Sequence, residues 1–93
     1  MIKAEEARNK VELEKLRRLR GAAADVVGLH VLEKISNLID AEASDMNCIA
    51  VYPLPDLGDK SYDALEAYFM ALGYRARCSY SVAAGYRLFL NWQ

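Results

Sequence analysis

Three arginines and one phenylalanine stand at alternate positions of the last two strand-like segments, where their chemistry suits a phosphate-bearing ligand. Arg75 and Arg77 alternate with apolar residues in residues 74–81, and Arg87 and Phe89 lie in residues 86–93. Because successive side chains of a strand point to opposite faces, these four share the polar face of a predicted hairpin. A guanidinium group can bind phosphate in bidentate fashion, and an aromatic ring can stack on a base. The pattern indicates a nucleotide or a weakly bound nucleic acid as a ligand.

The same arginines have two structural interpretations that the sequence leaves open. Charged side chains on the outer face of a strand keep an exposed edge soluble. They can equally pair with acidic residues from the middle of the chain. No glycine-rich phosphate loop accompanies them in the sequence.

Catalytic and metal-binding patterns are missing from the sequence. It contains none of the common nucleotide, hydrolase or metalloprotease motifs. Cys48 and Cys78 are too few and too far apart for a disulfide framework or a zinc site, and His30 has no second ligand nearby. We expect a non-enzymatic protein without a metal or a cofactor.

The composition is that of one folded domain. The chain has 93 residues, of which 54% are hydrophobic and 27% charged, enough for a single compact core. Its apolar runs are far shorter than the roughly 20 residues that cross a bilayer, and MIKAEEARNK lacks the apolar segment of a signal peptide. We expect a soluble intracellular protein that is neither secreted nor membrane-spanning.

Charge is distributed unevenly along the chain. Residues 1–20 hold seven basic and four acidic side chains, residues 21–74 hold two and nine, and residues 75–93 hold three arginines and no acid. Basic ends can mark a contact with nucleic acid or a membrane surface. The alternating signs of residues 3–20, with pairs such as Glu14 and Arg18, favour instead a solvated helix.

Residues 1–44 are predicted to form a helical arm, either as one long helix or as two helices with a break near Gly21. The segment has no proline and is rich in good helix formers. Its apolar residues recur at steps of three and four, which makes one stripe: Leu16, Leu19, Ala23, Val27, Val31, Ile35 and Leu38. In an unbroken helix Gly21, Ala24 and Gly28 would form a smooth face for close approach of another backbone.

We expect the arm to mediate self-association. The stripe would be about 33 Å long in a helix, too long to be buried by a small sheet and one covering helix. The residues predicted to make this contact are Leu16, Leu19, Gly21, Ala24, Val27, Gly28 and Val31.

Residues 47–93 are predicted to form a β-α-β-β unit, which makes the whole chain a single α+β domain. The run CIAVYPL is a first strand, and KSYDALEAYFMAL is a helix with Asp59 as N-cap and Gly73 just past its end. Tyr62, Leu65, Phe69 and Leu72 should form its buried face. A right-handed crossover sets the first two strands parallel. The third strand is the most apolar, which predicts the order 1-3-2.

Trp92 shares the inner face of the last strand with Leu88 and Leu90. We expect it to tie down the C-terminus. Its predicted neighbours are Tyr62 or Leu65 on the covering helix, or the long N-terminal helix.

The chain resembles small uncharacterised proteins encoded by tailed bacteriophages. The resemblance rests on a charged leading helix that begins MIKAEEAR, on LGY at the end of the second helical segment, and on a closing strand RLFLNW. The resemblance implies a protein of the infected bacterial cytoplasm that acts without catalysis. Its partner would be a virion protein, if it is an assembly component, or a host protein that it blocks stoichiometrically. The resemblance transfers no functional residues.

Overall fold

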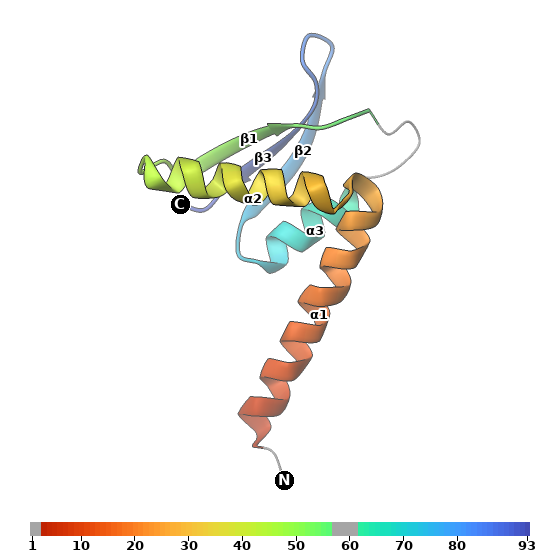
Figure 1. Cartoon of the computed structure of the whole chain (residues 1–93), viewed down its shortest axis with the longest axis vertical. Helices are drawn as coiled ribbons and strands as arrows, with labels where there is room; N and C mark the ends of the chain where they lie inside the picture. The colour runs from red at the N-terminus through yellow and green to blue at the C-terminus, as the bar shows by residue number, and fades with distance from the viewer. Residues whose placement is uncertain (1–2, 57–61) are drawn as a thin grey trace.

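The computed structural model describes residues 3–56 and 62–93. Its elements confirm the predicted α+β class, with helices first and a three-stranded sheet after them (Figure 1). In chain order they are α1 (Ala4–Val27), α2 (Leu29–Ser44), β1 (Ile49–Pro53), α3 (Asp63–Ala71), β2 (Arg75–Ser81) and β3 (Gly85–Asn91).

The sheet has the predicted order β1-β3-β2. Both neighbouring pairs are antiparallel, so β1 and β2 run parallel to each other on either side of β3. Leu88 of β3 stands opposite Tyr52 of β1 and Cys78 of β2. Leu88 and Leu90 are buried, as the apolar character of a central strand requires.

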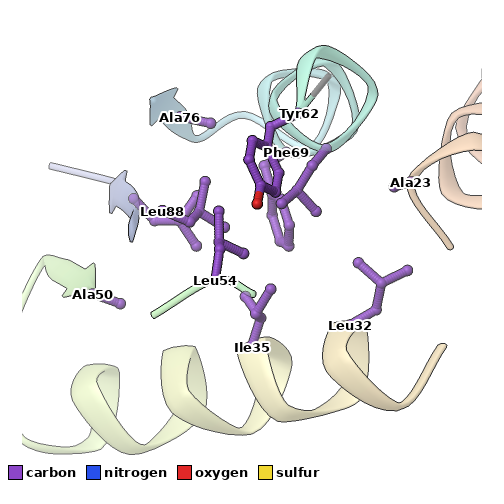
Figure 2. Packing of buried hydrophobic residues seen from close by; sticks show 11 residues of the cluster. Ala23, Leu32, Ile35, Ala50, Leu54, Tyr62, Phe69, Ala76 and Leu88 are labelled. Atoms are coloured by element: carbon purple, nitrogen blue, oxygen red, sulfur yellow. The ribbon is translucent and has the colours of Figure 1, made fainter. Parts of the chain in front are cut away.

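Helices α2 and α3 cover one face of this sheet and leave the other face open. Figure 2 shows Ile35 and Leu32 on α2 and, on the opposite side of the cluster, Tyr62 and Phe69 at α3, with Leu88 of the sheet between the two helices. The buried cluster comprises Ala23, Leu32, Ile35, Ala50, Leu54, Tyr62, Leu65, Phe69, Ala76, Leu88 and Leu90.

The N-terminal helical segment is broken, but at Gly28 rather than near Gly21. Gly21 lies inside α1, whereas Gly28 has φ 88° and ψ 151° and separates α1 from α2. The predicted smooth face of Gly21, Ala24 and Gly28 on a continuous helix is therefore wrong. Gly28 turns the chain sharply, so that α2 returns over the sheet while α1 leads away from the fold (Figure 1).

This turn also lets the chain bury most of the predicted apolar stripe, although Leu16 and Leu19 lie outside the core cluster. Ala23 and Ile35 are buried, and Val27, Val31 and Leu38 pack against the core of the same chain. The N-terminal part of α1 extends away from the rest of the fold (Figure 1), and the molecule measures 56 Å along its longest axis.

Helix α3 ends as predicted. Gly73 has φ 102°, its N–H donates to the carbonyl of Met70 at 3.0 Å, and the N–H of Tyr74 donates to that of Phe69 at 3.1 Å, which is the Schellman pattern. Leu72 was expected in the core and is instead 44% exposed. The proposed N-cap, Asp59, lies outside the described residues.

Trp92 lies on the helix-covered side of the sheet, as its parity predicted. Its ring meets Tyr74 edge-on at 5.9 Å between centroids, and it borders a hollow together with Ile39 and Ala43 of α2. The predicted neighbours Tyr62 and Leu65 are therefore wrong, and the alternative placement against the N-terminal helical segment is the correct one.

Candidate binding surfaces

The open face of the sheet carries all four residues predicted to bind a ligand. Arg77 stands opposite Phe89, and Arg87 stands opposite Ser79. Arg75 and Arg77 are exposed on β2, while Arg87 and Phe89 are half-buried on β3. The strand register thus brings together side chains from two strands as the alternation predicted.

The charge of this face is not compensated. The guanidinium carbon of Arg87 lies 5.1 Å from the centroid of the Phe89 ring, a cation–π contact. Within residues 3–56 and 62–93, none of the three guanidinium groups forms an ion pair with a carboxylate. Pairing with acidic residues of the middle segment is therefore not what these arginines do in the described fold.

Two shallow hollows flank the Phe89 ring. One, of about 340 Å³, is lined on the open face by Ile49, Arg75, Arg77, Phe89 and Asn91. The other, of about 340 Å³, is lined by Arg77, Ser79 and Phe89. Both hollows share Arg77 and Phe89. The contribution of Ile49 and Asn91 was not anticipated, although alternation along each strand already places them on this face.

A groove runs between α2 and α3 on the other side of the molecule. It consists of two adjoining hollows of about 180 and 400 Å³ that share Ile39, Leu72 and Tyr74. Its other apolar lining comes from Leu32, Tyr68, Phe69, Ala43 and Trp92, and its charged lining from Arg20, Glu33 and Asp40. This groove could not be predicted from the sequence, because it depends on the spacing between two helices.

The N-terminal part of α1, residues 4–18, is called the arm below. Its Val11 is 53% exposed and its Leu13 is 67% exposed. The predicted pair of Glu14 and Arg18 is present at 3.4 Å, and both side chains are solvent-accessible. The arm is therefore a charged helix that exposes the apolar side chains of Val11 and Leu13.

The residues predicted for self-association divide between the arm and the core. Leu16 and Leu19 are half-buried, and Gly21 is exposed within α1. Ala24, Val27 and Val31 pack against the core, and Gly28 forms the break. Only the N-terminal members of this set remain accessible to another chain.

Cys78 lies between β2 and α3. Burial, followed by the charge of Glu66, raises the pKa of its thiol to about 12.

In the described part of the chain no group of three or more His, Cys, Asp or Glu side chains could hold a metal ion. No described helix combines the length and the apolar character needed to cross a membrane.

Comparison with known proteins gives no relative from which to transfer a function: no family model, curated protein or solved structure matches the chain.

Proposed function

We propose that this chain is a non-enzymatic interaction protein that self-associates, with the arm of one copy docking in the α2–α3 groove of another. The observation that carries the proposal is an arm that stands clear of the fold with Val11 and Leu13 exposed. An isolated helix of about 12–15 residues is only marginally stable in water. Contact with a second chain would stabilise the arm.

The groove is complementary to the arm in apolar character and in charge. Its apolar floor includes Tyr68 and Leu72, and Leu72 is 44% exposed without a partner. Glu33 and Asp40 outnumber Arg20 in its lining, which gives the groove a net acidic character. Arg17 and Arg18 of the arm share Glu14 as their ion-pair partner and have side chains that are 84% and 80% exposed. Electrostatic complementarity of this kind favours association between copies and fixes its orientation.

Reciprocal exchange of arms would close a symmetric dimer, and non-reciprocal docking would build an open chain of copies. Either product suits a protein that acts by stoichiometric contact, as the resemblance to bacteriophage proteins implies. The place of action would then be the bacterial cytoplasm, and a virion or host protein could be a further partner.

The test is the mass in solution, measured by light scattering over a micromolar dilution series. We expect a mass above one chain that falls on dilution. Leu13→Glu should shift the dissociation toward higher concentration, because it places a charge in the apolar contact. Val82→Glu is the matched control, since Val82 is 94% exposed in the hairpin loop. A mass of one chain throughout the series would overturn the proposal.

A further inference from the structure

The open face of the sheet favours an occupant that brings negative charge. Its three arginines have no carboxylate partner in the described fold, and the strands β1, β2 and β3 contain no acidic residue. Stacking the same face of a second copy on it would bring six guanidinium groups together. The proposed docking of the arm in the α2–α3 groove leaves this surface free.

The three arginines form a ladder with regular steps. Arg75 and Arg77 are two residues apart on β2, and Arg87 stands at the level of Ser79 through its cross-strand pairing. Two residues of a strand rise about 6.6–6.8 Å. This step is comparable to the distance between successive phosphates of an extended nucleic acid strand.

Aromatic surface is available at the middle of the ladder. Phe89 stands opposite Arg77, and the two hollows on either side of it share these two residues. Arg87 precedes Phe89 on β3 and lies over its ring, whereas Asn91 follows it and lines the first hollow. A planar base can therefore reach the ring from the Asn91 side without displacing Arg87.

We propose that this face binds single-stranded nucleic acid with a footprint of at least one dinucleotide step. One base lies in each hollow, and the base on the Asn91 side stacks on Phe89. Arg77 binds the phosphate that links the two nucleotides, while Arg75 and Arg87 bind the phosphates on either side. Aromatic stacking and cationic contacts to the backbone are the two components by which proteins hold single strands of varied sequence.

A single strand fits the surface better than a duplex or a mononucleotide. In a duplex the bases are stacked inside and cannot reach Phe89, so only the arginine contacts would remain. A mononucleotide fills one hollow and engages the ladder at one or two levels. Affinity should therefore increase from one to three nucleotides and change little beyond.

The experiment is fluorescence anisotropy with labelled oligothymidylates and oligouridylates of one to eight nucleotides, and with a duplex of eight base pairs, at low salt. Phe89→Leu should weaken binding of the trinucleotide by about 5- to 150-fold, the loss expected for one stacked base. Arg77→Gln should weaken it and reduce the slope of log affinity against log salt by about 0.7.

Lys34→Gln is the matched control, because it removes an exposed cation from α2, outside the open face and the proposed arm contact, and should leave oligonucleotide affinity unchanged. Melting temperatures of all three variants establish that each is folded. Three outcomes would overturn the proposal. The first is that no oligonucleotide binds. The second is that duplex and inorganic polyphosphate bind as tightly as the single strand and that Phe89→Leu weakens none of them, and the third is that an acidic peptide binds more tightly than any oligonucleotide. The last result would identify the face as a protein contact.

Discussion

The backbone N–H of Gly28 donates a 2.7 Å hydrogen bond to the carbonyl oxygen of Ala24, which ends α1 directly before α2 begins at Leu29. The φ of 88° and ψ of 151° at Gly28 fall in a region that essentially only glycine adopts. This one residue turns the chain sharply, so that Ala23 before it and Leu32 after it enter the same core. The corner thus depends on backbone conformation rather than on side-chain packing at the glycine.

Gly28→Ala should therefore lower the free energy of unfolding by about 1–3 kcal/mol, the cost of holding a side-chain-bearing residue in this region. No heavy atom lies within 4 Å of the position of an added Cβ, so a clash contributes nothing. Urea denaturation followed by circular dichroism measures the change. An unchanged midpoint would show that the corner has another conformation in solution.

Gly21→Ala should have the opposite effect. Gly21 lies inside α1, is exposed and has open space around its Cα. Replacing glycine by alanine in a helix interior stabilises by about 0.5–1 kcal/mol. The same urea titration tests it. A destabilised Gly21→Ala protein would contradict the placement of the break at Gly28.

The position of the helix break, at Gly28 and not near Gly21, could not be predicted from the sequence. Both reduce helix propensity equally, and nothing local distinguishes them. The break lies at Gly28 because it places Ala23 against α3 and Ile35 against the sheet, contacts between residues far apart in the chain. The sheet order, by contrast, could be predicted, since strand alternation and the apolar character of β3 depend only on near neighbours in sequence.

The open face of the sheet was predictable for the same reason. The period of two puts Arg75, Arg77, Arg87 and Phe89 on one side, whatever the packing around them. The hollows were not predictable, because they depend on the register that aligns Arg77 with Phe89. Tyr80 illustrates the limit of this alternation. It shares the inner face but is 60% exposed, since it lies near the hairpin end, where its ring centroid is 4.8 Å from that of Tyr86.

Ionisation of the Cys78 thiol should make the free energy of unfolding depend on pH in the alkaline range. Burial and the nearby Glu66 raise its pKa from 9.0 to about 12. The folded state holds the thiol proton more tightly than the unfolded state does. The neutral thiol therefore makes its full contribution to the free energy of unfolding at pH values below the pKa of Cys78 in the unfolded chain. This contribution is lost as pH rises from about 9 to about 12. Cys78→Ala should reduce the slope of unfolding free energy against pH in this window, and an identical slope in both proteins would contradict the assignment.

The fluorescence of Trp92 should show whether the C-terminal residues pack against the rest of the fold. Its backbone N–H donates to the carbonyl of Cys48 at 3.0 Å, and its ring is half-buried against Tyr74. Truncation after Leu90 should cost about 2 kcal/mol, less than the ~3–5 kcal/mol for a fully buried large aromatic. Thermal denaturation measures the loss. Native Trp92 emission should lie to the blue of the denatured spectrum, and a fully water-exposed emission would refute this packing.

Charge reversal tests whether the arm of one copy meets the groove of another. Arg17→Glu with Arg18→Glu makes the arm acidic, and Glu33→Lys with Asp40→Lys makes the groove basic. Each double variant then repels its own kind, because arm and groove carry the same sign. Each should therefore have the mass of one chain at micromolar concentration.

Mixing the two double variants restores opposite charges at every contact. The acidic arm of the first variant meets the basic groove of the second, and the unaltered basic arm of the second meets the unaltered acidic groove of the first. The mixture should therefore regain the mass of the unaltered protein, and light scattering at low salt measures it. High salt should weaken the restored complex, because exposed charges are screened. If the separate variants associate as well as the mixture does, the arm does not dock in this groove.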